Sequence, residues 1–293
     1  MRALPILAVL AACTPPLTEA DQDIIGGTRA TGSSATVLLA GYPPDRSVLT
    51  TCSAVLVSPT VLLTSAHCID AANHPSYQFG IFTGDDASAY STLALLEPHL
   101  LPVASVHPHP QYQTAVPFYA DLGAVVLAQP VTAISPLPMR RQSLDTSLVG
   151  AQATIVGYGQ TTYQQPNQTR YEAVTMVAGI DGDTVIVGDA QKHGCLGDSG
   201  GPAIVGGVVI GVDSYGPVGC GTAAHYRRTD MFLPFLDQYV PPPAAPDAGP
   251  SGGGGGPDAG TDDHGAGGGG CNTGRGGSLA VGLALLALLR RRR

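Results

Sequence analysis

Residues 194–202 read Gly-Cys-Leu-Gly-Asp-Ser-Gly-Gly-Pro. A serine hydroxyl becomes an effective nucleophile only when a base takes its proton, and the oxyanion that it generates needs N–H donors already in place. Glycines on both sides of Ser199 let the backbone turn its amides inward and let a substrate chain come close. A Gly-rich turn with an incidental serine would explain a bare Gly-Asp-Ser-Gly, but the whole string is more specific. It predicts an acyl-transfer site with Ser199 as nucleophile and the amides of Gly197 and Ser199 as the oxyanion hole.

This string resembles the nucleophile motif of the trypsin-like (chymotrypsin-family) serine peptidases, which implies a histidine and then an aspartate upstream. Residues 64–68, Thr-Ser-Ala-His-Cys, match the family's Ala-His-Cys motif at the end of an apolar run. Residues 120–127 begin Ala-Asp-Leu-Gly and are similar to the family's Asp-Ile-Ala-Leu segment. The resemblance implies that His67 is the general base and that Asp121 holds its imidazole tautomer.

The part of the chain from Ile24 to about Val240 has the pattern of an all-β domain. Its short apolar runs are separated by turn signals roughly every ten residues. The resemblance implies two six-stranded antiparallel β-barrels with the active site between them, the first over about 24–130 and the second over about 139–230. Residues 93–96 are among the predicted strands, residues 129–138 are the predicted crossover, and residues 231–240 are the predicted closing helix.

The six cysteines of the chain divide into two groups. The family resemblance implies the disulfides Cys52–Cys68 and Cys195–Cys220, which in turn imply an oxidising compartment. Cys13 and Cys271 lie outside the predicted domain. The net charge of −8 and the lack of a basic patch in the domain argue against nucleic acid as a partner. We expect a monomer that acts on protein or peptide substrates and needs no metal or cofactor.

The sequence Ile-Ile-Gly-Gly that begins at Ile24 resembles the N-terminus that this family exposes when its zymogens are activated. In the family, the freed ammonium group pairs with the aspartate before the nucleophile, here Asp198, and a buried carboxylate needs such a partner. Asp23 stands where trypsin-activated zymogens carry Lys or Arg. Activation by a trypsin-type enzyme is therefore not expected.

Substrate binding is predicted from two further matches. Ser214, Tyr215 and Gly216 resemble the family's Ser-Trp-Gly edge, along which an extended peptide adds as a strand. Gly216 is expected to keep the pocket entrance open, and Ala224 is expected to line its wall. These residues would give affinity for a peptide backbone without selecting its sequence.

The side-chain preference is expected to depend on His193. It lies six positions before the nucleophile, where trypsins carry the aspartate that receives Lys or Arg, so specificity for Lys or Arg is not predicted. One interpretation is that the imidazole attracts an acidic residue, which would let the enzyme cut after its own Asp23. The other is a neutral polar pocket, with activation by another protease. The sequence leaves both open.

The N-terminal residues 1–23 are predicted to be an export signal and a short pro-segment. The apolar residues Leu4–Leu10 lead into Leu-Ala-Ala-Cys, which resembles a bacterial lipoprotein box that ends at Cys13. Cys13 would then be lipidated. Ordinary signal cleavage after Ala20 is the alternative.

The C-terminal residues divide into a spacer and a signal. Residues 241–270 are rich in Gly and Pro and predict a disordered linker. Residues 271–293 combine Cys271, the apolar run Leu279–Leu289 and the basic Arg290–Arg293. They resemble the myxobacterial C-terminal sorting tag, in which the cysteine marks processing and anchoring. A short monotopic anchor is the alternative, since the run covers only about half of a ~30 Å hydrocarbon layer.

Together these features predict an exported serine endopeptidase of the bacterial cell surface or outer membrane, or a secreted form released from it. It would be made as a zymogen and act through an acyl-enzyme. The alternative is a catalytically silent adhesion or binding protein on a peptidase scaffold. Retention of His67, Asp121, Ser199 and Gly197 favours the enzyme.

Overall fold

The computed structural model describes residues 24–32, 34–115, 118–160 and 167–242. The chain divides into two compact units, Met1–Pro243 and Ala244–Arg293. The second unit and the N-terminal residues 1–23 lie outside the described residues, and so do the predicted signals with Cys13 and Cys271. In the part of the chain that is described, no helix is long and apolar enough to cross a membrane.

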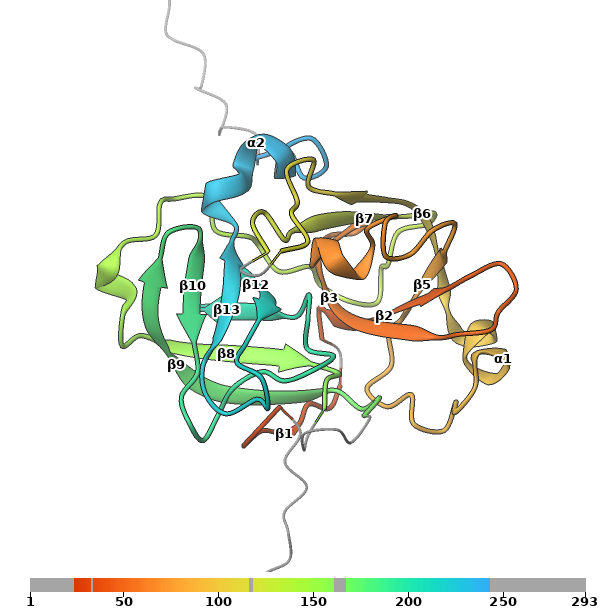
Figure 1. The fold of residues 1–293 in the computed structure, drawn as a ribbon, viewed down its shortest axis with the longest axis horizontal. Helices are drawn as coiled ribbons and strands as arrows, with labels where there is room; N and C mark the ends of the chain where they lie inside the picture. The colour runs from red at the N-terminus through yellow and green to blue at the C-terminus, as the bar shows by residue number, and fades with distance from the viewer. Residues whose placement is uncertain (1–23, 33, 116–117, 161–166, 243–293) are drawn as a thin grey trace, which may run out of the picture. The chain divides into compact units, whose positions relative to one another are not determined.

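The first half of the described chain forms a closed antiparallel barrel (Figure 1). Its strands pair in the order β2-β3-β4-β7-β6-β5. Every residue of β2 is buried, because this run of mostly apolar side chains faces the barrel interior on one side and other packed elements on the other. The strands are β2 (Thr36–Tyr42), β3 (Thr50–Ser58), β4 (Val61–Thr64), β5 (Gln78–Phe82), β6 (Leu101–Pro108) and β7 (Gly123–Leu127).

The second half forms another six-stranded antiparallel barrel, in the order β9-β10-β13-β12-β11-β8, and the pairing of β8 with β9 closes it. In β9 the residues from Tyr171 to Ala178 alternate between buried and exposed, which is the period of a strand with one face on a core. The prediction of two six-stranded barrels is confirmed. The strands are β8 (Gln152–Gly157), β9 (Tyr171–Asp181), β10 (Thr184–Val187), β11 (Pro202–Val205), β12 (Val208–Tyr215) and β13 (Ala224–Arg228).

The N-terminal segment belongs with the second barrel, not with the first. The short strand β1 (Thr28–Arg29) pairs with β9 and extends the second barrel's sheet. Ile24 is only 1% exposed and packs in the core of the second barrel, with Ile155 and Val185. The first barrel therefore begins at β2.

Two predictions, one of a strand and one of a helix, differ from the structure. The predicted strand at residues 93–96 is a helix, α1 (Leu93–Leu96), in which Leu93 and Leu96 are buried and the two residues between them are exposed. This spacing of three fits one face of a helix. The predicted helix at 231–240 is shorter: a 3-10 turn at Asp230–Phe232 leads into α2 (Leu233–Leu236). Pro234 lies in the first turn of α2, where its missing N–H does no harm.

The barrels share packing and both predicted disulfides are present. Val209 and Val212 of β12 contribute to the hydrophobic core of the first barrel. Cys52 is bonded to Cys68 with a Cα–Cα distance of 6.3 Å, and Cys195 to Cys220 with one of 5.2 Å. The disulfide predictions are confirmed, and each bridge ties a segment of the site described below to a neighbouring strand or loop.

Candidate active site

His67 and Asp121 lie together at one edge of the first barrel. His67 sits on a 3-10 turn (Ala66–Cys68) directly after β4, and Asp121 precedes β7. The Nδ1 atom of His67 lies 2.8 Å from Oδ2 of Asp121, and the backbone N–H of His67 donates to Oδ1 at 2.9 Å. The hydroxyl of Ser214 donates to Oδ2 at 2.6 Å. Since Asp121 is completely buried, these donors stabilise its charge and fix the ring that it holds.

The turn around Ser199 can be made only with glycine. Gly197 and Gly200 have φ angles of +96° and +86°, a region that favours glycine. A Cβ atom on Gly200 would lie 2.1 Å from the carbonyl oxygen of Ser53 and 2.2 Å from Oγ1 of Thr64. The turn also lies against β3, where the N–H of Ser53 donates to the carbonyl of Ser199 at 2.9 Å. The first barrel therefore holds the turn around Ser199, which belongs to the second barrel.

Asp198 lies inside this turn, with its carboxylate bound to backbone amides. Its Oδ1 accepts from the N–H of Gly159 at 2.9 Å and its Oδ2 from the N–H of Cys195 at 2.8 Å. Nearby on the same barrel, Ile25 forms an antiparallel bridge with His193. The structure thus places Ile24, the residue predicted to become the N-terminus, in the barrel that carries Asp198.

His67 and Ser199 line one cavity of about 540 Å³. Gly194, Asp213, Gly216 and Ala224 line the same cavity, and we call the part of it beside these four residues the inner pocket. Ser214, Tyr215 and Gly216 also line this cavity. A cavity lined by a serine, a histidine and these small residues can place one substrate bond at the serine and a neighbouring substrate side chain in the inner pocket.

The rim of the cavity is aromatic. The ring of Tyr215 stacks on His225 at 4.5 Å between centroids and lies 6.2 Å from Phe118, edge to face. Beneath them, the guanidinium of Arg227 lies 5.5 Å from the ring centroid of Tyr215 and donates to the carbonyl of Phe118 at 2.8 Å. Phe118 and Arg227 were not predicted, because their roles depend on which loop contacts which strand.

The pocket is not built around the imidazole of His193. The Nδ1 atom of His193 lies 2.8 Å from the carbonyl oxygen of Asp189, and Nε2 contacts the carbonyl oxygen of Cys220. Both ring nitrogens therefore face backbone acceptors, and the residue is only 1% exposed. The cavity is lined instead by its neighbour Gly194 and by Asp213. The expectation that His193 provides the pocket base is not met, because its ring is turned away.

Asp213 is the acidic side chain that the sequence analysis missed. It is 5% exposed and lies on β12, one residue before Ser214. Burial raises the pKa of its carboxyl group well above the usual value, and the nearby Asp198 and Asp121 raise it further. The available signal was an aspartate directly after the apolar residues Val208–Val212, at a position where a buried strand would be expected to continue.

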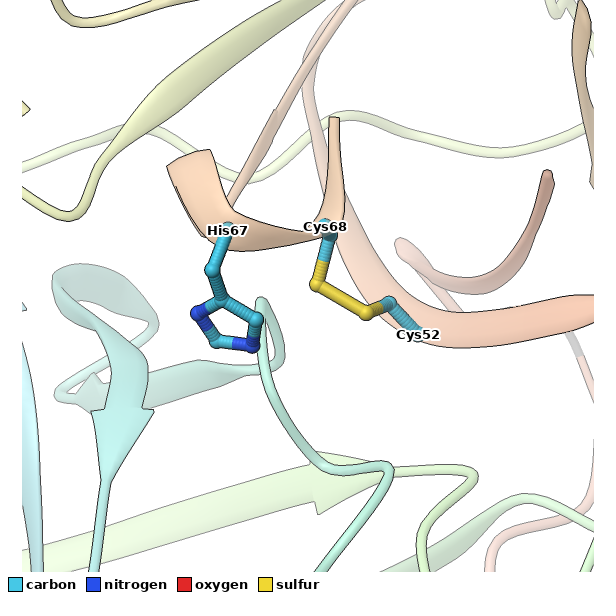
Figure 2. A group of neighbouring side chains, drawn as sticks. All are labelled: Cys52, His67 and Cys68. Carbon is cyan, nitrogen blue, oxygen red and sulfur yellow. A yellow bond between two sulfur atoms is a disulfide. The ribbon is translucent and has the colours of Figure 1, made fainter. Parts of the chain in front are cut away.

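A possible metal-binding group near His67 is explained by a disulfide. The ligand atoms of Cys52, His67 and Cys68 lie within 4.8 Å of one another. Figure 2 shows the two sulfur atoms joined to each other, with the imidazole beside them. Since a sulfur in a disulfide is not a thiolate, these residues do not form a metal site in this state.

Comparisons with known proteins agree with this geometry. The family model described as Trypsin matches residues 24–236. A trypsin from Phaedon cochleariae is 30% identical over 241 residues, which cover 73% of this chain and 87% of that protein. Trypsin delta of Drosophila erecta is 28% identical over 220 residues, covering 70% and 82%. Among solved structures, neuropsin, a serine protease expressed in the limbic system of mouse brain, matches with a TM-score of 0.58 at 22% identity, covering 73% of this chain and 98% of that one. This last likeness concerns the fold alone.

Proposed function

The chain belongs to the trypsin family and is a serine endopeptidase, and we propose that it cuts protein substrates with Ser199 as nucleophile, His67 as general base and Asp121 as the residue that orients the base. The observation that carries this assignment is the buried carboxylate of Asp121, which accepts bonds from the ring, the backbone of His67 and the hydroxyl of Ser214. This arrangement leaves the Nε2 atom of His67 to take a proton from a serine in the same cavity.

The reaction runs in two halves. Nε2 of His67 accepts the hydroxyl proton of Ser199 as Oγ attacks the carbonyl carbon of the substrate, and the amides of Gly197 and Ser199 donate to the oxyanion. The imidazolium then gives its proton to the leaving amine, and the peptide C–N bond breaks to leave an acyl-enzyme. A water molecule repeats these steps: His67 takes its proton, and the ester bond to Ser199 breaks as Oγ regains a proton.

Asp198 and Ile24 are proposed to switch this site on. Cleavage after Asp23 would give Ile24 a charged ammonium group, for which a buried carboxylate is the natural partner. Asp198 already fixes the amide of Cys195 within the nucleophile turn. Pairing with Ile24 would add a second restraint to the residues that form the oxyanion hole, so the precursor is expected to be a zymogen.

Export and surface attachment are proposed from the two ends of the chain. Two disulfides within the described residues are typical of a protein that folds in an oxidising compartment. We propose that the enzyme is a monomer, exported by its N-terminal signal and attached through Cys13 or Cys271. Mass spectrometry of both ends of the mature protein tests this: an intact N-terminus that begins at Met1 would contradict export by a cleaved signal.

Labelling with a fluorophosphonate tests the proposed nucleophile. The wild-type enzyme, matured from the full chain, should be labelled, whereas Ser199→Ala should lose labelling and His67→Ala should label at least roughly a hundredfold more slowly. Ser143 is exposed, and Ser143→Ala is the matched control that should label normally. A correctly matured wild type that takes up no label would contradict the proposal and favour a catalytically silent binding protein.

A further inference from the structure

We propose that Asp213 selects the substrate by receiving a cationic side chain, lysine or arginine, at the residue before the scissile bond. The inference rests on the proposed function, because it concerns the inner pocket beside Ser199. It assigns the choice of substrate to a strand residue that precedes the substrate-pairing edge, whereas the residue six positions before the nucleophile, His193, takes no part in lining the pocket.

The position of Asp213 fits recognition of a side chain that enters from Ser199. β12 carries Asp213 directly before Ser214 and Tyr215, so one short segment would bind the substrate backbone and its side chain. Gly216 and Ala224 line the same pocket, and a Cβ atom on Gly216 would lie 3.6 Å from Cβ of Ala224. Because both residues are small, neither of them fills the cavity that Asp213 also lines.

Gly194 provides the space that the carboxyl group occupies. A Cβ atom on Gly194 would lie 2.7 Å from Oδ2 of Asp213 and 3.3 Å from the hydroxyl of Tyr226. A contact of 2.7 Å is too short for any side chain, so an alanine at this position would displace the carboxyl group. The glycine and the aspartate thus form a complementary pair, and the pocket depends on both.

The carboxyl group of Asp213 has no cationic partner among the described residues. Among the described residues, no lysine or arginine forms an ion pair with Asp213. The ion pairs of the described arginines join Arg29, Arg46, Arg141, Arg227 and Arg228 to other carboxylates. A substrate cation would supply the missing charge in a pocket largely shielded from water, where its attraction to a carboxylate is strong. A substrate carboxylate would instead be repelled by Asp213 and would find both nitrogens of His193 occupied by carbonyl oxygens.

Binding of a cation should release a proton. In the empty pocket, burial keeps the carboxyl group of Asp213 neutral over a wider pH range than usual, because its pKa is raised. A bound ammonium or guanidinium favours the ionised form and reverses that shift. The titratable groups around Asp213 or lining the same cavity are Asp198, Asp121, Tyr226, His67, His74, Tyr112 and Tyr215.

This specificity would also decide how the precursor is activated. The bond before Ile24 follows Asp23, whose side chain carries the wrong charge for a pocket that contains Asp213. The enzyme would therefore not cut its own activation bond. Of the two interpretations that the sequence left open, the inner pocket favours activation by a different protease.

Matched peptide substrates test the inference directly. The four substrates differ only in the residue before the scissile bond, which is Arg, Lys, Leu or Asp. Wild type should prefer Arg and Lys, and Asp213→Asn should lower kcat/KM for them by roughly 30- to 1,000-fold while changing that for Leu only severalfold. Asp189 bonds to loop amides next to His193 but does not line the cavity, so Asp189→Asn is the matched carboxylate control and should keep the preference.

A binding measurement separates this inference from the proposed chemistry. Benzamidinium, a small aromatic cation, should bind to Ser199→Ala, and the affinity should increase as the pH rises. It should bind at least roughly 30-fold more weakly when Asp213→Asn or Gly194→Ala is added, whereas neutral benzyl alcohol should discriminate little.

The outcomes are distinguishable. A wild type that reacts with fluorophosphonate but prefers Asp or Leu substrates, or an Asp213→Asn enzyme with an unchanged ratio of Arg to Leu hydrolysis, overturns the inference and leaves the proposed function standing. A wild type that takes up no fluorophosphonate, together with tight benzamidinium binding, would contradict the proposed function and leave the inference standing.

Discussion

Asp213 should lower the stability of the protein at neutral pH. Its pKa in the folded protein lies well above the ordinary value of 3.8, so unfolding releases a proton at any pH between the two values. The free energy of unfolding therefore falls as the pH rises through this range, by about 1.4 kcal/mol per pH unit. Asp213→Asn should be more stable than wild type at about pH 7 and should lose this advantage below pH 3.8. Denaturant titrations at both pH values check this, and a difference independent of pH would contradict it.

Single residues also show where reasoning from the sequence reaches its limit. His67, Asp121 and Ser199 could be placed because each lies in a motif of several residues, and the structure brings the first two into direct contact. Counting six positions back from Ser199 predicts His193 as the pocket base, but a count gives a position in the chain and not the direction of a side chain. In the structure, the ring of His193 faces two backbone carbonyl groups, and Asp213 of β12 lines the pocket instead.

The turn around Ser199 should tolerate no side chain at Gly200, whereas the turn at Gly206 in the same barrel should tolerate an alanine. Gly200→Ala places its Cβ 2.1 Å from a carbonyl oxygen at a φ of +86°, so activity and stability should both be lost. Gly206 has a φ of +59° with nothing within 4 Å, which makes Gly206→Ala the matched control. It should lose only the roughly 1–2 kcal/mol of a left-handed alanine and keep full activity. Thermal unfolding and peptide hydrolysis measure both, and equal losses would contradict the steric argument.

Among the elements, a short apolar run did not by itself distinguish a strand from a helix. The mostly apolar residues Val208–Val212 and Ala173–Ala178 lie within the strands β12 and β9. The run at Leu93–Leu96 is equally apolar but forms α1. Four residues are too few to distinguish a spacing of two from a spacing of three, and the packing of Leu93 and Leu96 decided between them.

Across the whole molecule, removal of the C-terminal signal should release an active enzyme. Every residue of the candidate site lies between Ile24 and Arg227, so deletion of residues 270–293 should leave kcat/KM for a peptide substrate within about twofold of wild type. The deleted form should appear in the medium and the full chain in the membrane fraction. Loss of activity on deletion would show that these residues support the peptidase domain.

The sequence predicted the two barrels through the family resemblance, yet it assigned the segment from Ile24 to the first of them. The β propensity of Thr28 and Arg29 does not identify their pairing partner, because two such residues could pair with any exposed strand edge. Their partners, Glu172 and Tyr171, are far along the chain, and a pairing over such a distance is set by tertiary packing.

That pairing orders events while the chain is being synthesised. The segment Ile24–Arg29 is the first part of the domain to leave the ribosome, but its sheet partner β9 comes much later, and Val185 and Ile210, which share a core with Ile24, come later still. Contacts so distant in sequence form late in folding. The segment that is synthesised first is therefore the last to pack. A nascent chain that stops before β9 contains all strands of the first barrel, but its N-terminal segment has no sheet to pair with.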